Sequence, residues 1–152
     1  MKLLASDLAN AIGGRLVGPD IDIDGATFDS RQVLHHQLFV PIVAERDGHE
    51  FISDALKAGA GVYLTSRPEL FEGLGGTAIV VDDTAQALID AARWGRTQFP
   101  ASTVVVGVTG SVGKTSTKDL IVAALSSAKR VVANVRSFNN EQGLPVTILN
   151  AS

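Results

Sequence analysis

The chain has 152 residues, with 13 basic and 16 acidic side chains and a formal net charge of −3. Because neither sign forms a long run, no basic stripe is available for a nucleic-acid backbone, and nucleic acid is not an expected partner. The absence of cysteine excludes disulfides, thiolate metal ligands and cysteine nucleophiles. No apolar stretch is long enough for a signal peptide or a membrane span, so we expect a cytoplasmic protein without membrane insertion.

The first third of the chain predicts one short helix followed by strands. Residues 6–12 place apolar side chains on one helical face, with Ser6 as a possible N-cap. Residues 21–28 alternate apolar and polar side chains and predict a strand, a turn and a second strand, followed by an exposed loop at 29–31. Residues 37–43 predict another strand, in which Pro41 argues for a sheet edge or a bulge.

The middle of the chain alternates helices and strands. Residues 49–58 predict a helix that ends at Gly59, and the β-rich stretch 62–66 follows it. A further strand is expected at 77–83, and Asp83 or Thr84 should cap the helix that comes next. This alternation is typical of an α/β domain.

Residues 99–103 combine a proline with small polar side chains and predict a domain boundary. We therefore expect one α/β domain over 1–100 and the beginning of a second over 101–152. In the second part, a valine-rich strand, a glycine loop, a helix over about 114–127 and a strand at 130–135 predict a β-loop-α-β unit. A last helix is expected to begin near Gly143 and Pro145.

The glycine loop GVTGSVGKTSTKDL, residues 107–120, has the composition of a phosphate-binding loop. Glycines let backbone N–H groups approach an anion closely, and the helix that follows adds the positive end of its dipole. Lys114 would bring a cation to the β and γ phosphates, as the catalytic lysine, and the Thr115 hydroxyl would bind Mg²⁺. The predicted ATP-binding residues are Gly110, Ser111, Val112, Gly113, Lys114, Thr115 and Ser116.

The strict P-loop pattern requires glycine at position 108, where this chain has Val108. The match to the general pattern is therefore incomplete. The alternative interpretation is a glycine turn that only joins a buried strand to its helix, with Lys114 solvated.

The segment 108–118, VTGSVGKTSTK, resembles the ATP loop of the Mur ligases, where T-G-[ST]-x-G-K-T replaces the strict pattern. Further similar segments are FDSR (28–31), LFVPIV (38–43), DGHEFISDALKAGA (47–60) and NNEQGLPVTIL (139–149). Among the Mur ligases, these segments look most like the members that add D-alanyl-D-alanine. The resemblance implies an α/β fold with a small uridine-nucleotide domain followed by the first βαβ unit of a P-loop ATPase domain.

The resemblance also implies a reaction and its substrates. ATP with Mg²⁺ would activate the terminal carboxylate of a UDP-N-acetylmuramoyl-tripeptide as an acyl phosphate, and D-alanyl-D-alanine would then form the amide in peptidoglycan precursor synthesis. Mur ligases have a much longer central domain and a third domain, so we expect this chain to be an N-terminal fragment, or a naturally truncated relative, that does not complete ligation alone. Its oligomeric state is not predicted by any pattern in the sequence.

The resemblance places the UDP-substrate contacts at Ser30 and Arg31, and assigns further substrate-side contacts to Asn139 and Asn140. Arginine can pair with diphosphate oxygens, although an exposed surface arginine is the alternative. The two asparagines could instead close helix ends. For residues 47–49, a turn in which His49 caps the helix and a substrate contact both remain open.

Three other functions remain possible at this point. The chain could be a nucleotide-binding module without turnover that derives from a Mur ligase. It could belong to the related ligase that adds the third amino acid of the peptide. It could also be an unrelated P-loop kinase or GTPase, although the Asp29–Arg31 segment upstream of the loop argues against that.

Overall fold

The computed structural model describes residues 2–134 and 141–151, and its main feature is a mixed sheet of five strands. In spatial order the strands are β2 (Arg15–Val17), β7 (Thr77–Val80), β6 (Val62–Thr65), β5 (Leu38–Phe39) and β4 (Ala26–Thr27). The last four are parallel, and β2 runs antiparallel to β7. A separate antiparallel pair joins β1 (Lys2–Leu4) to β3 (Asp22–Asp24).

The helices are α1 (Ala5–Ala11), the 3₁₀ turn η1 (Gly48–Phe51), α2 (Ile52–Ala58), the 3₁₀ turn η2 (Pro68–Leu70), α3 (Phe71–Leu74), α4 (Thr84–Thr97), α5 (Lys114–Leu125) and α6 (Gly143–Leu149). Helices and strands alternate from β5 to α4, whereas β2 to β5 follow one another without a helix and α4 to α6 without a strand in the described chain. The helix that was predicted from residue 49 and its end at Gly59 are confirmed, because Gly59 closes α2 with a φ of 111°. Asp83 caps α4, because its carboxylate accepts hydrogen bonds from the backbone N–H groups of Ala85 and Gln86.

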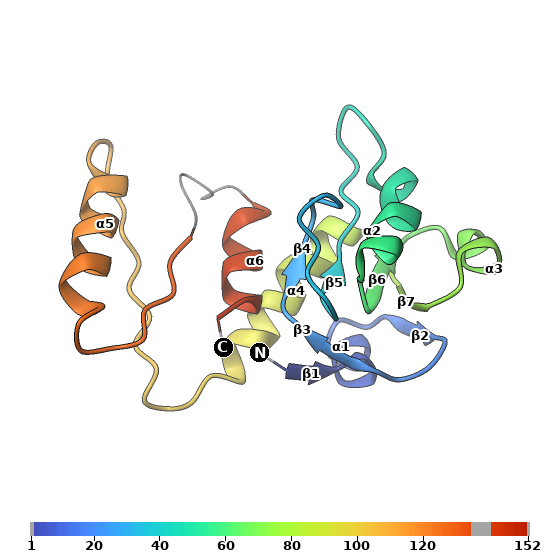
Figure 1. Ribbon diagram of the computed structural model, residues 1–152, viewed down its shortest axis with the longest axis horizontal. Coiled ribbons are helices and arrows are strands. Elements are labelled where there is room, and N and C mark those ends of the chain that lie inside the picture. The colour runs from blue at the N-terminus through green and yellow to red at the C-terminus, as the bar shows by residue number, and fades with distance from the viewer. Residues whose placement is uncertain (1, 135–140, 152) are drawn as a thin grey trace.

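The sheet is covered on both faces, which explains why its strands are almost continuously apolar. In β6, Val62 and Leu64 point into one core, which α1, α4 and α6 complete, whereas Tyr63 points into the other core beneath α2 and α3. All four residues of β6 are buried. Figure 1 shows these helices gathered around the strands, so the α/β prediction for this part is confirmed.

Two local predictions for the first part of the chain were wrong. Pro41 suggested an edge or a bulge, but β5 lies inside the sheet and ends before the proline. The N–H that proline lacks is therefore not needed in the ladder, and its carbonyl accepts a hydrogen bond from the Thr84 hydroxyl. Ser6 does not cap its own helix, because α1 begins one residue earlier and Ser6 instead donates through N–H and hydroxyl to Asp20.

The predicted β-loop-α-β unit is present only as its helix. The structure has α5 where it was expected, but no strand over 104–108 or in the described residues 130–134. A strand is held by hydrogen bonds to a neighbouring strand, and neither segment has such a partner among the described residues. The side chains of Val104, Val105 and Val106 are accordingly exposed.

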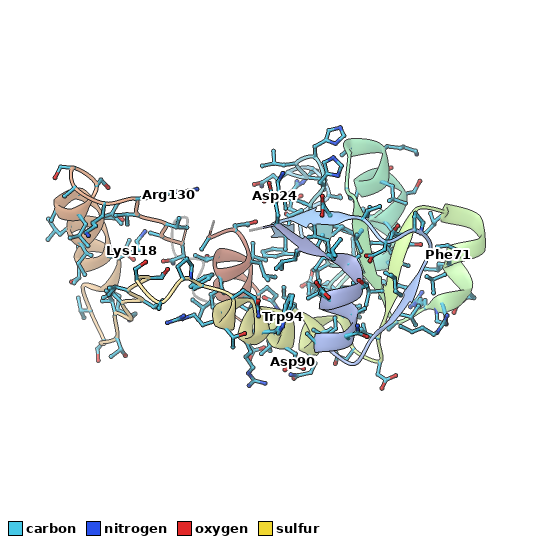
Figure 2. The ribbon with its side chains drawn as sticks, turned by 90° about the horizontal axis from the view of Figure 1, so that it is seen from below. Asp24, Phe71, Asp90, Trp94, Lys118 and Arg130 are labelled. Carbon is cyan, nitrogen blue, oxygen red and sulfur yellow. The ribbon has the colours of Figure 1, made fainter. Side chains whose placement is uncertain are left out.

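Helix α6 packs on the body of the sheet, although it follows α5 in the chain. It lies beside α4 (Figure 1), and its Leu149 is buried in the same core as Leu88 of α4. Figure 2 shows Lys118 and Arg130 on the α5 side of the molecule, away from Asp90 and Trp94 of α4. No helix among the described residues is both long enough and apolar enough to cross a membrane.

Candidate functional site

The glycine loop takes the shape of an open turn that leads into α5. Gly110 has a φ of 146° and Gly113 a φ of 82°, both in the region that favours glycine. Gly113 occupies the N-cap position of α5, and space is open around its Cα. A side chain at either position would therefore be strained by the backbone, whereas glycine leaves the inner face of the turn accessible to a ligand.

The backbone N–H groups of residues 110–116 point to no acceptor in the described chain. Among the described residues, no capping side chain covers the start of α5. A row of unpaired N–H groups at the positive end of a twelve-residue helix matches the needs of a phosphate. The geometry of these N–H groups therefore fits an anion.

The Lys114 side chain folds back along the glycine loop. Its Nζ donates to the carbonyl oxygen of Gly110, which places the ammonium group beside the turn. The side chains of Ser111, Thr115 and Ser116 are exposed beside it, which leaves their hydroxyls available to a ligand. The assignment of Thr115 to Mg²⁺ stays a prediction, as do the roles of the other loop residues.

The Asp29–Arg31 loop lies at the carboxyl end of β4. Thr27, the last residue of β4, accepts the N–H of Asp29 through its hydroxyl at 3.2 Å. The Asp29 carboxylate in turn accepts from the Arg31 backbone N–H at 3.0 Å and from its guanidinium at 2.9 Å on each oxygen. The Arg31 side chain is 85% exposed, so its remaining N–H donors face solvent, and Ser30 lies between the paired residues. The loop therefore holds a cation beyond the carboxyl ends of the parallel strands, where open α/β sheets bind ligands.

Hydrogen bonds from Arg31 lower the pKa of Asp29 to about 2. Because the folded chain favours the carboxylate, this pair stabilises the fold above pH 4 and loses that contribution as the pH falls toward 2. Replacing Arg31 with glutamine is expected to raise the pKa of Asp29 toward its ordinary value of 3.8. Titration of the Asp29 carboxyl carbon by NMR measures this, and an unchanged pKa in the variant would contradict the pairing.

The two predicted substrate asparagines, Asn139 and Asn140, lie outside the described residues. The loops at Arg31 and at Gly110 belong to different parts of the structure, because α5 stands apart from β4 (Figure 1). The described residues therefore form two separate candidate sites, one on the sheet and one at the start of α5.

A third polar cluster joins the segments that follow β5 and β6. It consists of Asp47, His49, Ser66 and Arg67, of which only the first two were considered from the sequence alone. The segment does form a capping turn, but the prediction that His49 is the cap is wrong, because Asp47 caps the turn η1 by accepting a hydrogen bond from the His49 N–H. The buried His49 ring accepts from the Ser66 N–H at 3.1 Å through Nε2. Its Nδ1 therefore carries the proton and donates to Asp47 at 2.6 Å. These bonds to His49 lower the pKa of Asp47, which also forms an ion pair with Arg67.

Ser66 and Arg67 could have been found from their position at the end of the predicted strand 62–66 and directly after it. Half of the Arg67 side chain is exposed. Like Arg31, it therefore offers a guanidinium beyond the carboxyl ends of the parallel strands. The main role of the cluster is structural, because both ring nitrogens of His49 form hydrogen bonds within the chain. These bonds join the loop after β5 to the loop after β6.

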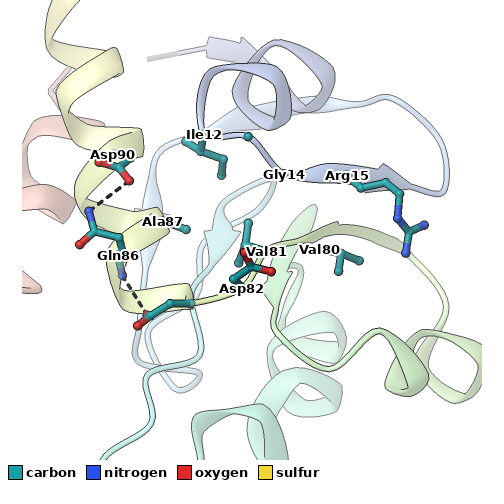
Figure 3. A pocket seen from close by; sticks show the side chains of 11 residues that line it. Ile12, Gly14, Arg15, Val80, Val81, Asp82, Gln86, Ala87 and Asp90 are labelled. Carbon is teal, nitrogen blue, oxygen red and sulfur yellow. Dashed lines mark hydrogen bonds between the residues drawn. The ribbon is translucent and has the colours of Figure 1, made fainter.

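A hollow of about 460 Å³ lies beyond the carboxyl end of β7, between Gly14, the residues 81–82 that follow β7 and the first turns of α4. Figure 3 shows the side chains that line it. Asp83 already satisfies the start of α4, and Gln86 bonds Asp90 at 3.1 Å. Asp82, Asp83 and Asp90 outnumber Arg15 among the side chains that line the hollow, which disfavours a phosphate. None of the predicted site residues that the structure describes lines it.

Comparison with known proteins gives consistent matches. Residues 108–152 match the family described as the Mur ligase middle domain. The UDP-N-acetylmuramoyl-tripeptide--D-alanyl-D-alanine ligase of Bacillus subtilis is 39% identical over 98% of this chain, which covers 33% of that protein.

Solved structures agree with the sequence matches. The UDP-N-acetylmuramoylalanyl-D-glutamyl-2,6-diaminopimelate--D-alanyl-D-alanyl ligase of Acinetobacter baumannii superposes over all of this chain and 34% of its own, with a TM-score of 0.84 and 28% identity. MurF ligase from Thermotoga maritima, solved in complex with ADP, matches 84% of this chain and 29% of its own, with a TM-score of 0.66 and 33% identity. The chain spans about a third of the length of these relatives, and over that length it is a homologue of MurF, the Mur ligase that adds D-alanyl-D-alanine in peptidoglycan synthesis.

Proposed function

We propose that this chain contributes the uridine-nucleotide site and the ATP loop of an ATP-dependent ligase that adds D-alanyl-D-alanine to a UDP-N-acetylmuramoyl-tripeptide. The observation that carries the proposal is the 39% identity to such a ligase across nearly the whole chain. The free N–H groups of the glycine loop support it, because a nucleotide phosphate needs such donors. As a ligase of peptidoglycan precursors, it would act in the cytoplasm.

The residues of the glycine loop fit ATP with Mg²⁺, and the ADP in the Thermotoga maritima relative supports this choice of nucleotide. The N–H groups of residues 110–116 would hold the phosphates, Lys114 would lie against the terminal ones, and the Thr115 hydroxyl would bind the metal ion. Bound MgATP supplies the phosphoryl group that activates a carboxylate. Lys114 and the loop position the nucleotide and stabilise its negative charge, and neither needs to move a proton.

The Asp29–Arg31 loop would hold the diphosphate of the UDP substrate. The exposed guanidinium of Arg31 keeps donors free while Asp29 fixes its orientation, so an incoming phosphate meets an arginine that is already in place. Ser30 would add a hydroxyl to the same anion. Asn139 and Asn140 are proposed on the substrate side of the ATP loop.

Calorimetric titration of the chain with UDP-N-acetylmuramoyl-tripeptide tests this proposal. Wild-type protein is expected to bind, and Arg31→Gln is expected to bind about 10- to 100-fold more weakly, the worth of one hydrogen-bonded charge. Arg93→Gln, which removes an exposed arginine paired to Asp90 on α4, is the matched control and should bind as wild type does. No binding by the wild-type chain, or equal binding by both variants, would contradict the assignment.

A further inference from the structure

The strand β4 lies at the edge of the sheet and has only two residues. It pairs on one side with β5, with Ala26 opposite Leu38 and Thr27 opposite Phe39. Such a short strand gains few ladder bonds, so its position depends on what meets its other side.

The side chain of Asn150 meets that other side. Its Oδ1 accepts from the Ala26 N–H at 2.8 Å, and its Nδ2 donates to the Ala26 carbonyl at 3.0 Å. A carboxamide offers one donor and one acceptor with the spacing of a peptide group, so it satisfies both backbone groups of one residue. Among the residues of similar size, aspartate could accept but could not donate.

The neighbouring backbone leaves room for this contact. Gly25 has a φ of 82°, and a Cβ there would lie 2.1 Å from the Asn150 Oδ1. Asn150 itself directly follows α6, whose Leu149 is 2% exposed within the core shared with α4. The packing of Leu149 therefore positions the Asn150 amide, and the missing side chain of Gly25 leaves the space that this amide occupies.

The strand that Asn150 holds leads directly into the Arg31 loop. Ala26 is followed by Thr27, whose hydroxyl accepts from Asp29, and Asp29 holds the Arg31 guanidinium by two hydrogen bonds. We infer that Asn150 is a positioning residue, which acts through Ala26 and β4 to orient the Arg31 guanidinium toward an anionic substrate. This inference rests on the proposed function for the identity of the anion.

The contact between Asn150 and Ala26 also connects the segments that carry the two candidate sites. Asn150 belongs to the residues that match the Mur ligase middle domain, which begin with the glycine loop, whereas Ala26 belongs to the sheet that carries Arg31. The two residues are 124 positions apart in the sequence. Through α6, the segment that carries the glycine loop thus has a fixed contact with the strand before the Arg31 loop.

The experiment compares Asn150→Ala, Asn150→Asp and the control Asn10→Ala, an exposed asparagine at the end of α1. Hydrogen exchange should show loss of protection at the Ala26 N–H in Asn150→Ala and partial protection in Asn150→Asp, which keeps an acceptor. Titration with UDP-N-acetylmuramoyl-tripeptide should show binding weakened about three- to tenfold in Asn150→Ala, and unchanged in the control.

A double-variant cycle separates positioning from a general loss of structure. If Asn150 acts through Arg31, adding Asn150→Ala to Arg31→Gln should cause little further loss of affinity. Equal losses in both backgrounds would overturn the inference, as would unchanged affinity in Asn150→Ala despite lost protection at Ala26.

A ligand-independent readout keeps this test apart from that of the proposed function. Without the hold on β4, the Asp29–Arg31 pair should loosen, and the pKa of Asp29 should rise from about 2 toward 3.8 in Asn150→Ala. If the wild-type chain binds no UDP ligand, the proposed function fails, while a raised pKa of Asp29 still supports positioning. An unchanged pKa would overturn positioning whatever the ligand.

Discussion

Replacing Lys114 with alanine is expected to weaken ATP binding by about 10- to 100-fold. The ammonium group lies beside the turn that would hold the phosphates, and a hydrogen bond to a charged group contributes about 1.5–3 kcal/mol. Calorimetric titration with ATP in the presence of Mg²⁺ measures the effect. The fold should be preserved, because the aliphatic stem of Lys114 lies at the surface and contributes to neither apolar core.

Lys129→Ala is the matched control for this prediction. It removes the same charge beyond the other end of α5, where the lysine side chain is exposed. ATP affinity should stay within about twofold of wild type, because exposed charges at that distance are largely screened by salt. If Lys114→Ala bound ATP as tightly as Lys129→Ala, the glycine loop would not be the nucleotide site.

Replacing Phe39 with alanine is expected to lower the free energy of unfolding by about 3–5 kcal/mol. Phe39 is 1% exposed in β5, between Thr27 and Tyr63 of the neighbouring strands, and its removal would leave a cavity beneath α2. Since whole domains are stable by only about 5–15 kcal/mol, this loss should also reduce the ordered population of the Arg31 loop.

Urea denaturation followed by circular dichroism and by the fluorescence of the single tryptophan measures this loss. Leu34→Ala serves as control, because its side chain is 66% exposed and should change stability by no more than about 0.5 kcal/mol. A loss below about 1 kcal/mol in Phe39→Ala would show that the packing at β5 differs from the structure.

Most of the α/β body could be predicted because periodicity and caps agree there. The helix over α4 follows from Asp83 and the apolar stripe through Leu88, and the strand β6 follows from an unbroken apolar run between glycine and polar residues. The edge strand β2, with the sequence Arg-Leu-Val, was missed because three residues give too short a pattern to distinguish it from a loop.

The valine-rich segment before the glycine loop shows where local pattern misled. Its composition is that of a buried strand, but burial and pairing come from other strands, and none meets it among the described residues. The glycine loop itself was predictable, because its chemistry is local: two glycines, a lysine and a helix start occupy adjacent positions.

The pairing of His49 with Ser66 and the contact of Asn150 with Ala26 could not be predicted by the same reasoning. Each joins segments that are distant in sequence, 17 positions for His49 and Ser66 and 124 for Asn150 and Ala26. A single asparagine near the end of a chain carries no pattern that names its partner. Such contacts depend on how the elements pack, and only the three-dimensional structure reveals them.

The contact of Asn150 with Ala26 also bears on how the protein behaves at high concentration. An open strand edge can recruit the same edge of another molecule and begin an extended aggregate. A side-chain amide on Ala26, with α6 packed beside it, occupies that edge where an incoming backbone would have to bond. The last helix thereby protects the β4 edge against intermolecular sheet growth.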